Sequence, residues 1–508
     1  MKKNIFLLLL LSCLLGACRR YSSPTQHINK IPSIYPDYTE TTFPPNIAPP
    51  NFAIQAQAEG YQVEIGAKGV ESIYICSDES TIEIPPKEWT AFLSAAKGKR
   101  IFFRISLLQA GEWVQYTDLW NQIATENIDG YLVYRLLYPG YELWNEMGIY
   151  ERNLSNYEER IIVDNRDFGK QCVNCHSFSK QSPENMMLHI RGKDGGTIIR
   201  RNGKIEKVNP RPEGYKNGAT YPAWHPKGKW IAFSSNEIQQ FFHAAGEKTI
   251  EVSDLAADLL FYETTTHQTF TDSLVYGTDY METFPIWDPD GTTLYFCRAK
   301  GYTEKTPLDS IRYDLYRVNF DAENLRLSNL TCVYEASAQG KSISFPQVSP
   351  NGKYLMFTLS DYGNFSIWHP ESDLYTLNLE SGEIRALEEV NSDHVDSYHT
   401  WDSSGHWFVV SSKRMDGLWA RPFIAYFDER TGKAQKPFLL PQKDPYFYDH
   451  FNYTFNRPEL IHSPIRVEKE ILQAIRQPVI QATQHKKAKF SPLYEKEGKG
   501  DNPYAVKK

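Results

Sequence analysis

The sequence lacks the short motifs of common enzyme classes. It contains no Gly-x-Ser-x-Gly, no His-Glu-x-x-His, no phosphate-binding P-loop and no Rossmann glycine pattern. It also lacks a block of basic residues before its far C-terminus, and its net charge is −7, so the electrostatic basis for nucleic-acid binding is missing. We therefore expect neither an enzyme nor a nucleic-acid-binding protein.

Long hydrophobic runs are absent except at the N-terminus. Lys2 and Lys3 precede the apolar run IFLLLLLSCLLGA, which is too short for a permanent membrane span. This order is typical of a signal peptide over residues 1–17. The tetrapeptide LGAC ending at Cys18 resembles the lipobox of bacterial lipoproteins, which implies lipidation of Cys18. The alternative is an ordinary secretory signal. We expect a periplasmic protein lipid-anchored to a bacterial membrane, with the outer membrane favoured.

Cysteine is scarce, with 7 residues in 508. Once Cys13 and Cys18 are set aside, the remaining five are odd in number and widely spaced, which is not a disulfide framework. They are Cys76, Cys172, Cys175, Cys297 and Cys332. Two of them stand close together, and in an oxidising compartment such a pair closes on itself or is captured by a prosthetic group.

Aromatic residues are abundant, at 14% of the chain, with 32 Tyr and 27 Phe. These residue types favour strands, and a chain of 508 residues exceeds the size of one core. We expect a mainly β protein of more than one domain. Residues 18–50 are rich in Pro, Ser and Thr and are predicted to be an extended tether. Short β-like runs with one helix after Pro86 predict a small β-sandwich-like domain over residues 51–165.

An internal repeat predicts the architecture of the rest. Each copy has an aromatic residue, a strand, a turn closed by glycine and a second strand, which indicates a hairpin whose glycine supplies positive φ. With further strand candidates between copies, the repeat predicts a β-propeller over residues 181–465, with six blades favoured over five or seven. A shortened copy begins at Phe178. The four full copies are YPAWHPKGKWIAFSSN from Tyr221, FPIWDPDGTTLYFCRA from Phe284, FPQVSPNGKYLMFTLS from Phe345 and YHTWDSSGHWFVVSSK from Tyr398.

The stretch QCVNCHSFSK within residues 166–180 carries the clearest chemical motif. In c-type haem attachment, two thiols spaced as Cys172 and Cys175 bond the haem vinyl groups, and a histidine placed as His176 ligates the iron. The spacing therefore predicts haem c. A zinc site or a redox-active dithiol is the alternative. Alternation along NMMLHIRG places Met187 and His189 on one strand face, so either is a candidate distal ligand, and five-coordinate haem stays open.

Together these segments resemble a known family. The copy FPIWDPDGTTLYF resembles the blades of TolB-type propellers, and the run from IDGYLVYRLLYPG through QCVNCHSF, with SSGHWFVVSSKR and FNRPELI, resembles bacterial lipoproteins often labelled cytochrome c biosynthesis proteins. The resemblance covers about residues 50–465. It implies a TolB-like propeller with a haem site and establishes no reaction. Residues 466–508 are predicted to form one helix and a flexible tail.

Three functions follow as expectations. The first is a membrane-anchored c-type cytochrome that transfers electrons to a protein docked on the propeller loops. The second is a non-redox TolB-like scaffold that binds a protein of the cell envelope, with the cysteine motif incidental or structural. The third is an accessory role in cytochrome c biogenesis. His225 and His399 lie in repeat copies and are interpreted as structural.

Overall fold

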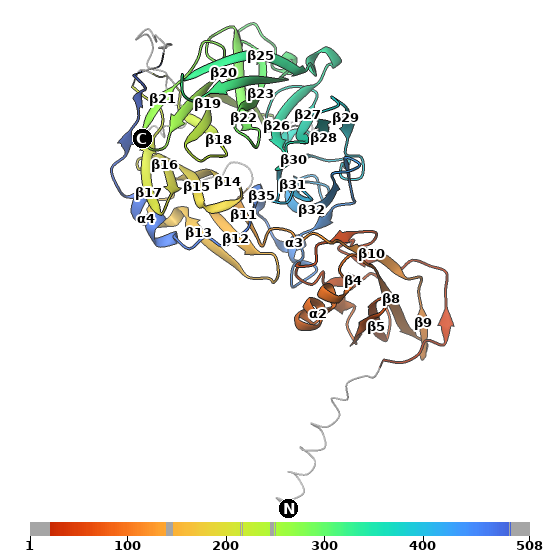
Figure 1. Cartoon of the computed structure of the whole chain (residues 1–508). Coiled ribbons are helices and arrows are strands. Elements are labelled where there is room, and N and C mark those ends of the chain that lie inside the picture. The colour runs from red at the N-terminus through yellow and green to blue at the C-terminus, as the bar shows by residue number, and fades with distance from the viewer. Residues whose placement is uncertain are drawn as a thin grey trace, which may run out of the picture. The chain divides into compact units, whose positions relative to one another are not determined.

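The computed structural model describes residues 21–138, 146–213, 215, 217–243, 248, 250–486 and 488. The fold is mainly β, as predicted, and divides into two compact units (Figure 1). Unit 1 contains Met1–Asn127 and Pro441–Phe451, and unit 2 contains Ile128–Leu440 and Asn452–Lys508. No helix in the described parts of the chain is long and apolar enough to cross a membrane.

Unit 1 is a small β-rich domain built on a seven-stranded sheet. Its central strand, β8 (Arg100–Gln109), pairs with β5 along one edge and with β9 and β10 along the other. The predicted helix is α2 (Pro86–Ala96), which buries Trp89, Phe92, Leu93 and Ala96. The other strands of this sheet are β1 (Gln26–His27), β3 (Thr42–Phe43), β5 (Gly60–Ala67), β6 (Val70–Ser77), β9 (Glu112–Gln115) and β10 (Leu119–Ile123). A second sheet contains β2 (Ile34–Tyr35), β4 (Phe52–Ile54) and β7 (Thr81–Ile82).

The predicted tether differs from the structure. From Gln26 onward the segment is part of unit 1: β1 pairs in parallel with β9 and β3 with β10. Tyr38, Phe43 and Ile47 are buried. The segment shows no apolar period because only two of its residues at a time add to a sheet edge, while single aromatic side chains fill the core.

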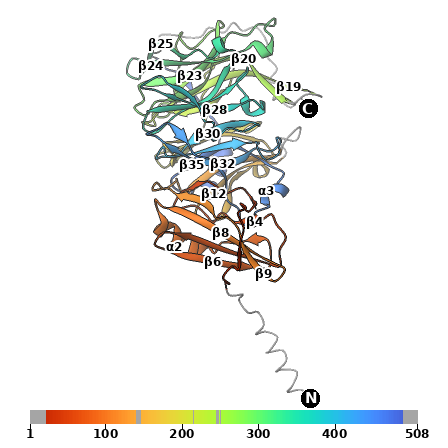
Figure 2. The same ribbon diagram turned by 90° about the vertical axis from the view of Figure 1, so that its right-hand side faces the viewer.

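Unit 2 is the predicted β-propeller. Its described residues form sheets of four or five strands arranged around a central opening, with each sheet seen edge-on in the turned view (Figures 1 and 2). The innermost strands carry the predicted repeat, and each pairs antiparallel with the next strand of its hairpin.

The strands of unit 2 fall into six sheets, taken here in chain order. The first contains β11 (Tyr131–Leu137), β12 (Met147–Asn153), β13 (Glu159–Asp164) and β35 (Thr454–Ile461). The second contains β14 (Cys172–Ser179), β15 (Ser182–Arg191), β16 (Gly196–Arg201) and β17 (Lys204–Asn209), and the third β18 (Ala219–Trp224), β19 (Trp230–Phe242), β20 (Ile250–Glu263) and β21 (Gln268–Phe270). The fourth contains β22 (Tyr280–Trp287), β23 (Thr293–Lys300), β24 (Asp314–Asp321) and β25 (Arg326–Tyr334). The fifth contains β26 (Ser342–Val348), β27 (Tyr354–Ser360), β28 (Asp373–Asn378) and β29 (Ile384–Ala386), and the sixth β30 (Asp396–Trp401), β31 (Trp407–Ser412), β32 (Arg421–Asp428), β33 (Lys433–Ala434) and β34 (Phe438–Leu439).

The first sheet is closed by the C-terminal part of the chain. Strand β35 pairs with β11, so residues 131–164, expected to belong to the N-terminal domain, are part of the propeller. The expected domain boundary near residue 165 lies instead at Asn127. The expected separate segment over residues 166–180 is also part of a sheet, because Cys172–Ser179 forms the innermost strand β14. These boundaries depend on pairing between residues far apart in the chain.

The C-terminal region follows the prediction of one helix. Helix α4 (Glu468–Ile475) buries Ile471, Ala474 and Ile475 against the first two sheets. Two short strands then extend the second and third sheets in parallel: β36 (Ile480–Gln481) pairs with β17, and β37 (Thr483–Gln484) pairs with β21. Most of the predicted flexible tail lies outside the described residues.

Candidate functional site

A β-bulge recurs in the innermost strand of each sheet, where the register shifts at two consecutive residues. In β18, for example, Thr220 pairs with Ser234 and Ala223 with Ala232, so Tyr221 and Pro222 form the bulge. The first bulge residue has positive φ in five of the strands, between 44° and 52°. A left-handed backbone costs a residue other than glycine roughly 1–2 kcal/mol. Repeated strain of this kind indicates that the side chain is needed where the bulge places it.

The strained residues line the central channel. Four are aromatic, and they contact one another in blade order: ring centroids are 4.7 Å apart for Tyr221 and Phe284, 4.5 Å for Phe284 and Phe345, and 4.4 Å for Phe345 and Tyr398. We call these four residues the aromatic belt. In the first sheet the equivalent residue is Arg457. The belt is therefore open on one side, where a cation replaces an aromatic ring.

The cysteine–histidine motif falls on the same register. In β14, Asn174 pairs with His189 and Ser177 with Met187, so Cys175 and His176 form the bulge. Cys175 takes the backbone position of the aromatic residue, and His176 takes that of the following proline or, in β30, of His399. The motif is thus the second sheet's version of the repeated aromatic–proline pair.

His176 is a core residue of the seam between the first two sheets. Its side chain is 1% exposed, and its ring centroid lies 6.0 Å from that of Phe178. Burial, with the nearby charges of Arg457 and Arg135, lowers the pKa of His176 to about 3, so the imidazole is neutral. Neither ring nitrogen has a hydrogen-bond partner among the described residues, and an unpaired buried polar group costs about 1–3 kcal/mol.

The two candidate distal ligands lie on the other face of this sheet. Met187 is 1% exposed and packs in the cluster shared with the third sheet, which includes Trp224. His189 Nδ1 lies 3.1 Å from Thr197 Oγ1. His176, by contrast, lies beside Val133 and Phe178, on the side of the first sheet. The sheet itself separates His176 from Met187 and His189, so they cannot ligate one iron from opposite sides.

The residues present do not fit a haem as they are folded. A porphyrin on His176 would displace the apolar side chains that join the first two sheets, including Phe178, Met186 and Leu188. Cys172 accepts a hydrogen bond from Asn174 Nδ2 at 2.9 Å and packs against the same cluster. No group of three His, Cys, Asp or Glu side chains among those described could hold a metal ion. The haem at Cys172, Cys175 and His176 stays a prediction from the motif.

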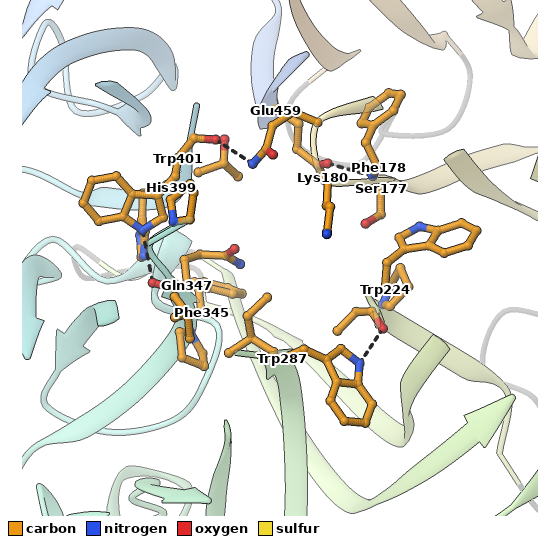
Figure 3. A pocket seen from close by; sticks show the side chains of 18 of the residues that line it. Ser177, Phe178, Lys180, Trp224, Trp287, Phe345, Gln347, His399, Trp401 and Glu459 are labelled. Carbon is orange, nitrogen blue, oxygen red and sulfur yellow. Dashed lines mark hydrogen bonds between the residues drawn. The ribbon is translucent and has the colours of Figure 1, made fainter. Parts of the chain in front are cut away.

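The channel contains a cavity of about 520 Å³. The bulges, the residues after them and the hairpin turns line it, as Figure 3 shows for ten labelled residues. Trp224, Trp287 and Trp401 form much of its wall, and the Trp287 and Trp401 indoles donate to the carbonyls of Ala223 and Gln347 at 3.1 and 3.2 Å. A concave, mostly apolar site with a few polar groups is typical of a small-molecule site.

Lys180 supplies the exposed charge of this cavity. It points into the space between the aromatic walls (Figure 3), and no carboxylate among the described residues pairs with it. Lys180 and Gln181 form the two-residue turn between β14 and β15, with φ of 52° and 53°. The full repeat copies use glycine in this turn, so only here do two residues with side chains carry left-handed strain. Gln181 Nε2 donates to the carbonyl of Trp401 at 3.3 Å, which fixes the turn against the sixth sheet.

An ion pair of β35 faces Lys180. Arg457 Nε lies 3.4 Å from Glu459 Oε1, and the Phe178 amide donates to Glu459 Oε2 at 3.2 Å. Burial raises the pKa of Glu459 to about 7, and Arg457 opposes that rise. Near neutral pH, Lys180 and Arg457 therefore outweigh a carboxyl that is only partly ionised, and the cavity is positively charged.

The seam between the second and third sheets is incompletely satisfied. Trp224 is 7% exposed, and its indole nitrogen has no partner among the described residues, although the equivalent nitrogens of Trp287 and Trp401 do. The strained turn at Lys180, the unpaired Trp224 donor and the unpaired His176 ring all involve β14 or the strand beside it. Unmet polar groups and strain concentrate where a ligand or partner completes a site.

Sequence reasoning missed the cavity residues. Lys180, Arg457 and Glu459 carry no enzyme motif. The signals were present, because FNRPELI aligns with the repeat and has Arg-Pro where other copies have an aromatic residue and proline, and the shortened copy has no glycine in its turn. Lys180 and Arg457 become neighbours only when β35 closes the propeller.

No protein-family model and no curated protein matches the chain. Solved structures do match. An oligogalacturonate lyase in complex with manganese is 14% identical, with a TM-score of 0.36, over 67% of this chain and 85% of that one. A prolyl endopeptidase is 12% identical, with a TM-score of 0.35, over 62% of this chain and 42% of the other. The acylaminoacyl peptidase of Pyrococcus horikoshii is 8% identical, with a TM-score of 0.31, over 67% and 44%.

These matches correct one expectation. We expected no enzyme because enzyme motifs are missing, and that inference is wrong, since chains with this type of fold include a lyase and peptidases. The correction reaches no further. At these identities the likeness shows the fold alone, and it gives this chain no reaction and no substrate.

Proposed function

We propose that the protein is a lipid-anchored periplasmic β-propeller that binds a small organic anion in its central channel. The observation that carries the proposal is Lys180, an unpaired cation on a strained turn that points into an aromatic-lined cavity. A carboxylate or phosphate there would pair with Lys180 and Arg457, and the ligand's body would pack on the tryptophan walls. Cavity size limits the ligand to one or two hexose-sized units.

The anchor and compartment belong to the proposal through the N-terminal sequence. The segment that contains Cys18 lies outside the described residues, so LGAC and the basic, apolar order before it are its support. Of the functions expected from the sequence, the binding scaffold agrees with the geometry. Electron transfer and a part in cytochrome maturation both need a haem that the folded β14 does not accommodate, so they are not part of the proposal.

The test compares probes that differ in charge. Binding of glucuronate, glucose 6-phosphate and N-acetylphenylalanine is measured by tryptophan fluorescence and calorimetry, with uncharged glucose as the reference. At least one of the anions should bind and glucose should not. Which anion binds separates a carboxylate site from a phosphate site. If none of the three binds, the proposal is wrong.

Two lysine variants assign the site. Lys180→Met removes the charge while keeping the length of the side chain, and loss of a charged hydrogen bond worth about 1.5–3 kcal/mol should weaken binding roughly tenfold to a hundredfold. Lys227→Met is the matched control, because Lys227 is exposed in the equivalent turn of the third sheet and does not line the cavity. Equal affinities for the wild type and Lys180→Met would contradict the proposal.

A further inference from the structure

The seven-stranded sheet of unit 1 has one face covered and one face open. Side chains alternate along its strands, so Ile101, Phe103 and Ile105 of β8 are buried on the covered face. On the open face stand Phe102 of β8 and Trp120 of β10, which pair directly and have ring centroids 5.8 Å apart. Trp120 is 37% exposed.

A second aromatic pair completes this face. Tyr74 of β6 stands opposite Glu64 of β5, which stands opposite Arg104 of β8, so the three form a row across the sheet. Tyr74 is 54% exposed, and the ring of Tyr21 lies edge-on to it with centroids 4.8 Å apart. We call Tyr21, Tyr74, Phe102 and Trp120 the aromatic face.

Arginines lie over the rings while their charge is balanced. The Arg100 guanidinium lies 4.2 Å from the centroid of Trp120, and that of Arg104 lies 4.5 Å from the centroid of Phe102. Arg104 also pairs with Glu64 at 2.8 Å and with Asp118 at 3.0 Å. The face is therefore aromatic and polar with little net charge. This is the character of side chains at the headgroup level of a membrane, where Trp and Tyr are enriched.

The position of the predicted anchor decides which surface this face meets. Tyr21 is the first described residue, and Cys18 precedes it by three residues. Three residues span at most about 11 Å when fully extended. A lipid on Cys18 would therefore hold Tyr21, and the sheet face on which it packs, within about that distance of the headgroups.

We infer that the aromatic face of unit 1 lies against the membrane that holds the Cys18 lipid, and inserts Trp120 and Tyr74 at the headgroup level. This inference rests on the proposed anchor and not on the proposed ligand of the channel. The face fixes the orientation of unit 1 on the membrane, and one acyl-modified residue gains a second attachment, as stable anchoring requires.

The experiment is hydroxyl-radical footprinting of the lipidated full-length protein in phosphatidylcholine vesicles, compared with the unlipidated chain that begins at Arg19. Oxidation of Tyr74 and Trp120 should fall several-fold in the vesicles. Tyr280 and Phe242 of unit 2 are matched internal controls, 41% and 49% exposed, and their oxidation should not change. Mass spectrometry of the N-terminal peptide verifies the lipid, and a chain without it overturns the inference independently of any result at the channel.

A second readout avoids dependence on oxidation chemistry. Vesicles that contain lipids brominated near the headgroup should quench the part of the tryptophan emission that Trp120→Phe removes. If Trp120 emission and the oxidation of Tyr74 are the same in vesicles as in solution, the inference is wrong. Protection that appears only when soluble glycan fragments are added would also overturn it, because the face would then bind a sugar polymer.

Discussion

Replacing Glu459 by glutamine tests the electrostatics of the cavity. Burial raises the pKa of Glu459 from 4.5 to about 7, so the folded protein holds this proton more tightly than the unfolded chain does. The stability gained from the proton is complete below pH 4.5 and is lost as the pH rises through 7. Glutamine has the same shape and can still accept the bond from the Phe178 amide, but it does not titrate.

The size of the effect follows from the shift. At about 1.4 kcal/mol per pKa unit, the wild type should lose at most about 2.5 kcal/mol between pH 5 and pH 8 that Glu459→Gln does not lose. The side chain is 12% exposed to the cavity, and water there relieves part of the burial cost. We therefore expect a difference of about 1–2 kcal/mol between the two pH profiles.

The assay is urea unfolding at several pH values between 5 and 8, followed by tryptophan fluorescence, to which the cavity residues Trp224, Trp287 and Trp401 contribute. Glu323→Gln, in an exposed turn of unit 2, is the control and should follow the wild type. If the profiles of Glu459→Gln and the wild type are parallel over this range, Glu459 is not held in a desolvated site and the reasoning fails.

Two further predictions concern β14. Lys180→Gly should raise the free energy of unfolding by about 1 kcal/mol by relieving the left-handed strain, while abolishing anion binding; if stability falls in denaturant unfolding, the turn is not strained by its side chain. Expressed with haem-attachment machinery, the folded protein should show no haem stain that survives SDS, because His176 lies in the seam between sheets; a stained band lost in Cys172→Ala would show that β14 leaves its sheet.

The repeat could be read from sequence because its period is local. Each full copy holds both strands of a hairpin and the glycine of its turn, so the pattern predicted the hairpins from β18–β19 to β30–β31. The first sheet was not predictable in this way. Its innermost strand, β35, is separated from β11 by the rest of the propeller, and no local pattern identifies which edge a strand closes.

The cavity was hidden for the same reason. Lys180 in the second sheet and Arg457 in the first are adjacent only in a closed ring, and each alone is an ordinary surface cation. The segment before Gly60 was misjudged because edge strands of two residues carry no alternation, although they bury Phe43.

The motif Cys175–His176 shows how one pattern supports two interpretations. As a string it fits haem attachment, because spacing is all that the string contains. In the fold, the same two residues occupy the bulge that is Tyr-Pro in β18, Phe-Pro in β22 and β26, and Arg-Pro in β35. In β30 the pair is Tyr398–His399, whose buried histidine also has unpaired ring nitrogens. A second buried histidine at the same blade position, with no cysteine beside it, means that the fold itself accepts histidine there. His176 therefore needs no metal to explain its place.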